Sequence, residues 1–294
     1  MTHKSGFVNI IGNPNVGKST LMNALVGEQL SIITSKAQTT RHRILGIVNG
    51  EDFQIVYSDT PGILKPNYQL QEAMIRFVRT ALVDADIILY VTDVVETADK
   101  NEIYLDKIAK TNRRVFLIIN KIDKADKEKI AGLSAQWKEI LPNATQFHVS
   151  ALKKQNLETL FNSILEALPE GPEYYPKDQL TDKPGRFFIS EIIREKILMN
   201  YQKEIPYSVE IEIEQYKEEE NIDRIMAVIH VARQSQKGII IGHQGKMLKK
   251  VGTEARIDME AFLQKKVFLE LYVKVKKDWR DNQNQLRNFG YITK

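Results

Sequence analysis

The stretch Gly12-Asn13-Pro14-Asn15-Val16-Gly17-Lys18-Ser19 decides the fold, because it spells the phosphate-binding pattern G-x-x-x-x-G-K-S. The apolar run 7–11 before it predicts a buried strand, and residues 20–25 after it predict the start of a helix. A phosphate loop requires this strand–loop–helix context. Gly12 and Gly17 would let backbone amides approach phosphate oxygens, and the helix N-terminus adds a positive dipole there. We therefore expect a nucleotide-binding domain.

Further residues complete the phosphate and metal chemistry. Lys18 is placed to neutralise the β- and γ-phosphates, and the Ser19 hydroxyl is placed to bind Mg²⁺. Asp59-Thr60-Pro61-Gly62 follows a predicted strand; Asp59 suits a water-mediated contact to Mg²⁺, and the Gly62 amide can reach the γ-phosphate. Thr40 is our first choice for a second hydroxyl at the metal, and Thr39 is the alternative.

Two later segments favour guanine as the base. Asn120-Lys121-Ile122-Asp123 ends a predicted strand, so it should face the same crevice as the phosphate loop. The Asp123 carboxylate can accept hydrogen bonds from the guanine N1–H and N2 amine, whereas a buried, unpaired Asp123 would reject adenine. Ser150-Ala151-Leu152 follows the last strand of the domain, where a backbone amide can meet the guanine O6.

The sequence thus yields three sets of expected site residues. The expected nucleotide contacts are Gly12, Asn13, Pro14, Asn15, Val16, Gly17, Lys18, Ser19, Thr20, Asp59, Thr60, Pro61, Gly62, Asn120, Lys121, Asp123, Ser150, Ala151 and Leu152. The expected catalytic residues are Lys18, Thr40 and Gly62. The expected metal ligands are Ser19, Thr40 and Asp59.

The remaining pattern predicts an α/β domain followed by a smaller one. Strand candidates at 44–48, 53–58, 87–91, 115–119 and 147–149 alternate with helical patterns, which predicts a mostly parallel sheet with flanking helices. Three prolines and a glycine between Leu168 and Pro176 then interrupt the helical pattern. We expect a first domain at 1–170, a linker at 171–185 and a second domain at 186–294.

The second domain has the predicted order α-β-β-α-α-β. An apolar stripe predicts a helix at 187–201, and strict alternation predicts a strand at 207–214. A second strand is expected at 225–231, a helix before the loop at 242–245, another helix at 253–264 and a closing strand at 267–275. Charge is uneven: residues 224–294 carry 15 basic and 6 acidic side chains. The excess suggests a polyanion-binding surface, whereas charge alone favours a solvated basic face. The aromatic residues of the segment 278–294 could pack on the domain or stack on a partner, and the sequence leaves both open.

Gly242-His243-Gln244-Gly245 is a G-x-x-G loop followed directly by lysines. A glycine loop lets a nucleic-acid backbone approach closely, with bases in an adjacent apolar groove. Residues 187–277 resemble a type II KH domain, an α+β fold whose loop clamps about four nucleotides of single-stranded nucleic acid. The RNA contacts implied by this resemblance are Ile241, Gly242, His243, Gln244, Gly245, Lys246, Lys249 and Lys250.

The first domain resembles the Era/TrmE-like branch of the translation-factor-class P-loop GTPases. The resemblance rests on the ordered motifs at 12–19, 59–62, 120–123 and 150–152. It implies GTP and GDP as ligands and Mg²⁺ as the metal. Ile63 stands where Ras-like proteins carry a water-positioning glutamine, so hydrolysis must use another group, a backbone, a partner or a monovalent cation. The resemblance implies that Asn15 can help to hold K⁺, together with the switch-loop backbone.

Joined to a type II KH domain, this GTPase resembles the Era GTPases. That resemblance implies binding to the 3′ region of small-subunit ribosomal RNA, a role in maturation of the small ribosomal subunit, and a monomeric, cytoplasmic protein with peripheral membrane contact. The absence of cysteine excludes disulfides and thiolate metal sites. The start of the chain lacks the apolar run of a signal peptide. Two alternatives stay open: an RNA-binding module with a vestigial GTPase, and a membrane-associated regulatory GTPase.

Overall fold

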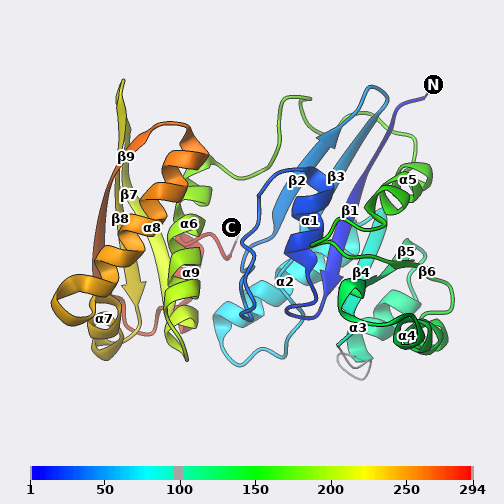
Figure 1. The fold of residues 1–294 in the computed structure, drawn as a ribbon, viewed down its shortest axis with the longest axis horizontal. Helices are drawn as coiled ribbons and strands as arrows, with labels where there is room; N and C mark the ends of the chain where they lie inside the picture. Colours follow the sequence, from blue (N-terminus) through cyan, green and yellow to red (C-terminus); the bar gives the residue numbers. More distant parts are fainter. Residues whose placement is uncertain (1, 96–101, 293–294) are drawn as a thin grey trace. The chain divides into compact units, whose positions relative to one another are not determined.

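The computed structural model of the chain describes residues 2–95 and 102–292 and divides into two compact units (Figure 1). Unit 1 comprises Met1–Pro66 and Met74–Asp182, and unit 2 comprises Asn67–Ala73 and Lys183–Lys294. The expected domain boundaries at residues 170 and 186 stay predictions. Residues 171–182, part of the expected linker, lie within unit 1, and unit 2 resumes at Lys183. Met1 and the last two residues of the tail fall outside the described residues.

Unit 1 is built on a six-stranded sheet in the order β2-β3-β1-β4-β5-β6. All neighbouring strands are parallel except β2 and β3, which confirms the mostly parallel sheet. The strands are β1 (Lys4–Gly12), β2 (Ile44–Asn49), β3 (Phe53–Asp59), β4 (Ile87–Asp93), β5 (Arg114–Asn120) and β6 (Thr145–His148). The helices are α1 (Lys18–Val26), α2 (Gln69–Asp84), α3 (Glu102–Ala109), α4 (Lys127–Ile140) and α5 (Leu157–Ala167), with a short 3₁₀ turn, η1 (Ile122–Lys124).

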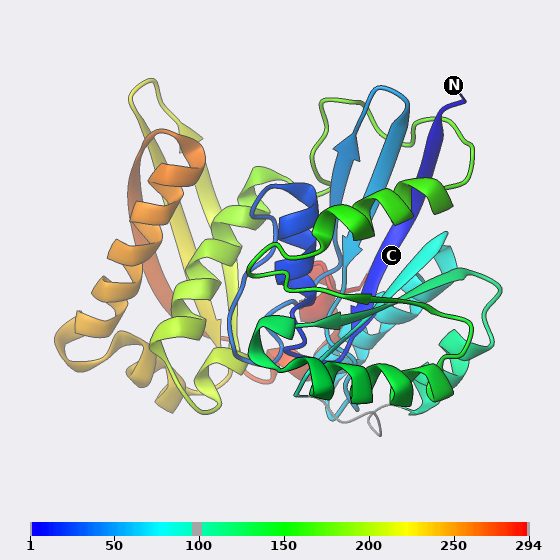
Figure 2. The ribbon, with the colours of Figure 1, turned by 45° about the vertical axis from the view of Figure 1, so that its right-hand side comes forward.

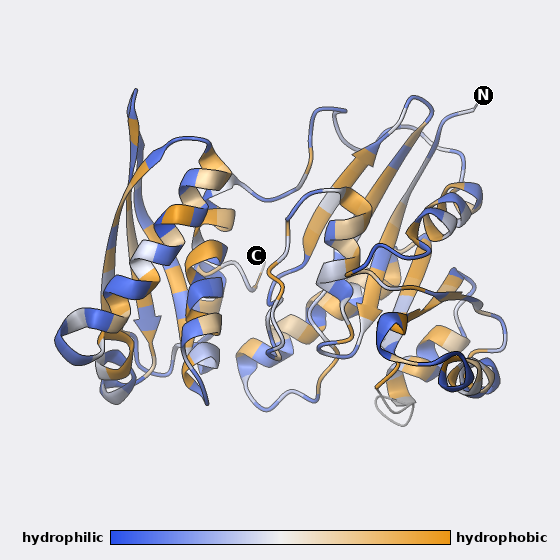
Figure 3. Cartoon of the chain, viewed as in Figure 1, coloured by the Kyte–Doolittle hydropathy of each residue, from blue (hydrophilic) through white to orange (hydrophobic). Residues whose placement is uncertain are grey.

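Apolar residues build the core of unit 1, and Figure 3 shows hydrophobic residues along the strands of its sheet. One core contains Ile88 and Tyr90 of β4 together with Val78 of α2, Leu105 of α3 and Trp137 of α4. The opposite face carries α1 and α5; Figure 2 shows α5 crossing the strands. Because the parallel strands point the same way, β1, β3, β4, β5 and β6 all end at one edge of the sheet, where loops can gather around a ligand.

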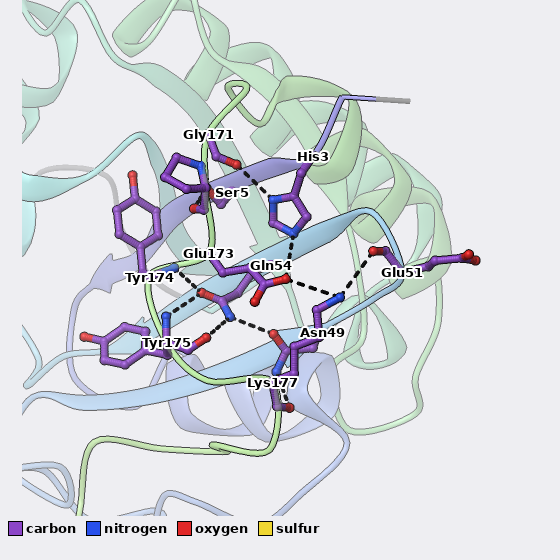
Figure 4. A network of polar contacts seen from close by, with 11 residues as sticks. His3, Ser5, Asn49, Glu51, Gln54, Gly171, Glu173, Tyr174, Tyr175 and Lys177 are labelled. Carbon is purple, nitrogen blue, oxygen red and sulfur yellow. Dashed lines mark hydrogen bonds and ion pairs between the residues drawn. The ribbon is translucent and has the colours of Figure 1, made fainter.

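Residues 171–182, here called the strap, are fastened to the β1, β2 and β3 side of the sheet (Figure 4). The buried Gln54 side chain accepts hydrogen bonds from the backbone amides of Tyr174 and Tyr175 at 2.7 and 3.0 Å, and it donates to the Tyr175 carbonyl at 2.8 Å. Farther along the strap, the Ile47 amide donates to the Leu180 carbonyl at 2.8 Å. The expected linker therefore begins as an ordered part of unit 1.

Unit 2 has helices packed on a three-stranded sheet, and its order α-β-β-α-α-β agrees with the sequence prediction. The sheet order is β7-β8-β9, with β7 and β8 antiparallel and β8 and β9 parallel. The elements are α6 (Gly185–Asn200), η2 (Ile205–Tyr207), β7 (Val209–Glu218), β8 (Ile222–Val231), α7 (Gln234–Ile241), η3 (His243–Gly245), α8 (Lys246–Leu263), β9 (Lys266–Val275), η4 (Trp279–Asp281) and α9 (Gln283–Asn288).

The boundaries in unit 2 differ most from the sequence prediction at the end of β7 and at the start of α8. β7 continues to Glu218 because Glu218 still pairs with Asp223 of β8, although the alternation of apolar and polar residues ends at Glu214. α8 begins at Lys246, seven residues before the expected start, because its first turns are rich in lysine and carry a weak apolar signal. Both errors lie where tertiary pairing outweighs the local pattern.

The aromatic residues of the tail pack back on unit 2, which settles the choice left open by the sequence. Trp279 is fully buried, and its indole Nε1 donates to the Ser208 carbonyl at 3.0 Å. The Tyr291 hydroxyl donates to Glu210 Oε2 at 2.7 Å, and Phe289 packs edge-on against Trp279. None of the described helices combines the length and the apolar composition needed to cross a membrane.

Removing the buried indole should destabilise unit 2. We expect Trp279→Ala to lower its free energy of unfolding by about 3–5 kcal/mol, because burial, packing and one hydrogen bond are lost together. Urea denaturation followed by hydrogen exchange in β7, β8 and β9 measures the effect. Lys277→Ala, at an exposed position nearby, is the control and should change little. Equal stability of the two variants would contradict the packing role of Trp279.

Candidate nucleotide and RNA sites

A cavity of about 410 Å³ lies at the strand-end edge of unit 1. Its volume falls within the range of small-molecule sites. It collects residues from the phosphate loop, from the segment before β2, and from the loops after β3, β5 and β6. The lining residues are Pro14, Asn15, Gly17, Lys18, Ser19, Thr20, Ile32, Ile33, Thr34, Ser35, Lys36, Gln38, Thr39, Thr40, Gly62, Asn120, Lys121, Asp123, Lys124, Ser150 and Leu152.

The phosphate loop connects β1 to α1, as its sequence context predicts. Gly17 has φ 96°, and a Cβ there would lie 2.3 Å from Asn120 Nδ2, so glycine is required by conformation and by space. Lys18 is nearly buried, and its Nζ donates to the Asn13 carbonyl at 2.7 Å across the loop. The N-terminus of α1 thus faces the cavity together with a lysine ammonium, an arrangement suited to phosphate.

Three oxygen-bearing side chains meet beside this loop. Ser19 Oγ donates to Asp59 Oδ2 at 2.7 Å, Thr40 Oγ1 donates to the same oxygen at 3.2 Å, and the two hydroxyls lie 2.9 Å apart. Asp59 is fully buried, and its Oδ1 has no hydrogen-bond partner among the described residues. Burial raises the pKa of this carboxyl, while Lys18 and the hydroxyls act in the opposite direction. Two hydroxyls and an unsatisfied carboxylate oxygen fit a hard cation such as Mg²⁺.

The geometry distinguishes the two candidate threonines. Thr40 is buried in the cluster with Ser19 and Asp59, whereas Thr39 Oγ1 donates to the Lys36 carbonyl at 2.7 Å, within its own loop. Thr60 also turns away, because its hydroxyl donates to the Ile10 carbonyl at 2.7 Å. Thr40 is therefore the better candidate for a metal ligand.

The guanine motif is tied directly to the phosphate loop. Asn120 Nδ2 donates to the Val16 carbonyl at 2.9 Å, and Asn120 Oδ1 accepts from the Ala151 amide at 3.0 Å. Lys121 Nζ donates to the Asn15 carbonyl at 2.5 Å and to Asp93 Oδ2 at 2.6 Å. The side chains of Asn120 and Lys121 thus hold the loops around the cavity in one arrangement.

Asp123 differs from the expectation in its burial. Its carboxylate is exposed at the cavity, and Oδ1 accepts a hydrogen bond from Ser150 Oγ at 2.5 Å. The side chain is exposed because it follows the end of β5 and lies on η1 rather than in the sheet. Leu152 is 67% exposed beside it and offers an apolar surface to a flat ring.

Some expected residues do not line the cavity, and some lining residues were missed. Gly12, Asn13, Val16, Asp59, Thr60, Pro61 and Ala151 are not among the lining residues, although several support those that are. The segment 32–36 was missed; its only sequence signal is that it precedes the polar stretch at 38–41. Asp93 was missed too, although it ends β4 at the same edge as the other motif residues.

A second cavity, of about 370 Å³, lies in unit 2 beside the G-x-x-G loop. Leu269 and Leu271 of β9 line it opposite Lys249 and Arg256 of α8. Gly245 lies at the lining and has φ 75°, while Gly242 has φ 70° and no room for a Cβ beside Met247. The groove has the apolar wall and basic rim that single-stranded nucleic acid requires.

The expected RNA contacts are only partly at this groove. Gly245 and Lys249 line it, whereas Ile241 packs on the hydrophobic core of unit 2 and Lys250 pairs with Glu254 at 3.8 Å. His243, Gln244 and Lys246 are exposed on or next to the loop. The sequence missed the groove residues Leu248, Gly252, Thr253, Arg256, Leu269 and Leu271, which come together only through packing of α8 against β9.

Comparison with protein families finds a match in each unit. Residues 7–121 match the family described as 50S ribosome-binding GTPase, and residues 204–280 match the KH domain family. Fold and sites therefore define a P-loop GTPase joined to a C-terminal KH domain. GTPase Era of Clostridium kluyveri is 45% identical over 290 residues, which span 98% of this chain and 99% of the relative. The chain belongs to the GTPase Era family.

Solved structures of this family have the same fold. A crystal structure of Era in complex with MgGDPNP and nucleotides 1506–1542 of 16S ribosomal RNA is 40% identical, covers 99% of this chain and 100% of its own, and has a TM-score of 0.94. An Aquifex aeolicus Era variant bound to GDP and AlF₄⁻ has the same identity, coverage and TM-score. The expected combination of a GTPase with a KH domain is thereby confirmed.

Proposed function

We propose that this GTPase binds GTP in the 410 Å³ cavity, hydrolyses it to GDP and phosphate, and binds the 3′ region of small-subunit ribosomal RNA through the groove beside the G-x-x-G loop. The observation that carries the proposal is the convergence of the phosphate loop, the Asp59 cluster and the guanine motif on one cavity. The Era crystallised with MgGDPNP and 16S ribosomal RNA supports both halves of it. The biological role that fits is assistance in maturation of the small ribosomal subunit.

Mg²⁺ is the metal we propose, held by Ser19 and Thr40 directly and by Asp59 through water. When bound, it would neutralise charge on the β- and γ-phosphates. Lys18 would act beside it on the same phosphates, and the Gly62 amide would bind the γ-phosphate. Gly62 suits that contact because a Cβ there would lie 2.7 Å from the Pro14 backbone nitrogen, so only glycine lets the two loops approach.

The attacking water must be positioned without help from the side chain of residue 63, because isoleucine has no polar group to hold it. Ile63 is buried in the hydrophobic core of unit 1, and its amide donates to the Gly12 carbonyl at 3.1 Å. We propose K⁺ at Asn15, which lines the cavity and has φ 66°, as an additional positive charge beside the phosphates. We also propose that the protein is a cytoplasmic monomer with peripheral membrane contact, as the family resemblance implies; lipid flotation and sedimentation test these points.

Base choice should depend on Asp123. We expect Asp123→Asn to weaken GTP binding by on the order of a hundredfold and to favour xanthosine triphosphate, because one hydrogen bond to a charged acceptor, about 1.5–3 kcal/mol, is lost and the new amide N–H would face a guanine N–H. Calorimetric titration with both nucleotides measures the change. Asp106→Asn, an exposed substitution on α3, is the matched control. Unchanged GTP affinity would rule out Asp123 as the base acceptor.

Turnover should be slow and should depend on the monovalent cation. We expect less than about one turnover per minute, because no water-positioning side chain is present at Ile63. Replacing K⁺ by Na⁺ at constant ionic strength should lower the rate several-fold, and Asn15→Ala in K⁺ should fall to the same level. Phosphate release measures the rate, with Lys18→Ala as the background. Equal rates in both salts with an active Asn15→Ala variant would exclude the K⁺ site.

RNA binding should depend on the exposed positions of the G-x-x-G loop. The double substitution His243→Asp and Gln244→Asp adds two negative charges where phosphates would lie, and should weaken binding by on the order of a hundredfold. The fold should survive, because both glycines remain and aspartate tolerates the φ of 50° at residue 244. Fluorescence anisotropy with an oligonucleotide of the ribosomal RNA 3′ end measures affinity, and GTP titration should be unchanged.

The neutral double variant, His243→Asn with Gln244→Asn, is the matched control and should keep most of the RNA affinity. If the aspartate variant binds RNA as tightly as the parent, the clamp lies elsewhere. If it loses RNA and GTP binding together, circular dichroism distinguishes misfolding from coupling of the two sites.

A further inference from the structure

The strap is attached to the strand that follows the segment carrying Thr40. β2 begins at Ile44 and lies at the edge of the six-stranded sheet, so only its inner side pairs with β3. On its outer side the Leu45 amide donates to Asp182 Oδ1 at 2.9 Å, and the Ile47 amide donates to the Leu180 carbonyl at 2.8 Å. A backbone bridge between Gly46 and Thr181 completes this short antiparallel pairing. The strap therefore covers an otherwise open sheet edge.

A short path of contacts joins this edge to the proposed metal site. Thr40 Oγ1 donates to Asp59 Oδ2, and the register of β2 and β3 places Ile44 opposite Asp59. Ile44 precedes Leu45, whose amide is held by Asp182. α6, the first helix of unit 2, begins at Gly185, so only two residues separate Asp182 from it. The path consists of neighbouring backbone segments and needs no long-range transmission.

The two ends of the strap are held with different strength. The inner end is Tyr174 and Tyr175, and the outer end is residues 180–182. At the inner end, Gln54 is 0% exposed and makes three hydrogen bonds to Tyr174 and Tyr175. Tyr174 is 48% exposed, but its ring packs against Phe7 with centroids 5.0 Å apart. Tyr175 packs on the apolar cluster of Leu45, Ile47 and Val56. At the outer end, the side chain of Leu180 is 41% exposed and Asp182 is exposed. Exposed pairings with few apolar contacts open at lower free energy than buried ones.

Arg43 fixes the point from which the preceding segment can move. Its Nε donates to Ser58 Oγ at 2.7 Å, and its NH2 group donates to Asn9 Oδ1 at 3.2 Å and to Asp84 Oδ1 at 3.1 Å. These bonds anchor the residue directly before β2 to three separate parts of unit 1. A rearrangement of residues 34–40 would therefore reach β2 through Asp59, which bonds to Thr40 and lies opposite Ile44 in the register of β2 and β3, rather than along the chain through Arg43.

We propose that residues 180–182 form a nucleotide-controlled latch on the outer edge of β2. The latch is closed while Thr40 and Asp59 are held together by GTP and its metal, and it opens when the segment 34–40 is released after hydrolysis. Opening lengthens the free chain before α6, while Gln54 keeps the inner end of the strap in place. The proposal rests on the proposed GTPase function and names the element through which nucleotide state reaches the RNA-binding unit.

Amide hydrogen exchange of the full-length protein tests the latch directly. With a non-hydrolysable GTP analogue, the amides of Leu45 and Ile47 should exchange at least about tenfold more slowly than with GDP, because their acceptors on the strap stay in place. The amides of Tyr174 and Tyr175 should be protected equally in both states. Equal protection of Leu45 and Ile47 in the two states, with normal nucleotide binding, would overturn the latch.

A matched set of variants separates the latch from simple destabilisation. Asp182→Ala removes the acceptor of the Leu45 amide and should accelerate its exchange in the analogue-bound state. Asp182→Asn keeps an acceptor oxygen and should behave as the parent, and so should Asp178→Ala, an exposed substitution elsewhere in the strap. Unaltered exchange in Asp182→Ala would overturn the role of that side chain.

RNA affinity supplies the functional readout. For the parent, affinity for a single-stranded 3′-end oligonucleotide should differ between the analogue and GDP by at least about threefold; Asp182→Ala should bring this ratio close to one. A ratio in Asp182→Ala equal to that of the parent would overturn the proposal. Failure of the parent to bind any guanine nucleotide would instead overturn the proposed function, and the latch with it.

Discussion

The side chain of Asn120 holds the nucleotide cavity together. Its amide nitrogen binds the Val16 carbonyl of the phosphate loop, and its oxygen binds the Ala151 amide of the loop after β6. Both contacts are buried, where an unpaired amide would be costly, so each keeps the other in place. The phosphate site and the base site are far apart in sequence, and this residue fixes the distance between them. The rest of the cavity depends on that fixed distance.

Residue order allowed much of the fold and the nucleotide site to be predicted. Gly17, Lys18 and Ser19 form a local motif whose geometry follows from the chain itself, and parallel strands bring Asp59 and Asn120 to the same edge. Residues whose position depends on packing could not be predicted. Leu269 and Leu271 alternate as in any half-buried strand, and only the placement of β9 against α8 makes them a groove wall. The exposure of Asp123 likewise depends on η1, which no pattern indicates.

In unit 2 the acidic residues gather on β7 and the basic residues at the start of α8, so the two kinds of charge lie on different elements. The glutamates of β7 are partly compensated across the sheet, since Glu214 pairs with Lys274 at 2.6 Å. Glu212 contacts His230 at 2.7 Å, and burial lowers the pKa of that imidazole. The lysines at the start of α8 are exposed; Lys249 lines the groove, and Lys250 pairs with Glu254 at 3.8 Å. A polyanion is thus attracted to one side of a domain whose charges nearly cancel elsewhere.

The attachment of the strap has a consequence for synthesis of the protein. Lys4, in the first strand, forms a backbone bridge with Glu170, and β2 pairs with residues 180–182. The first strand to be made therefore finds part of its pairing only after most of unit 1 has been translated. Because domains fold largely as units during synthesis, the nucleotide-binding unit can reach its complete structure only once residue 182 has emerged. The N-terminal unit can therefore complete its folding only when the segment that leads into the C-terminal unit has been synthesised.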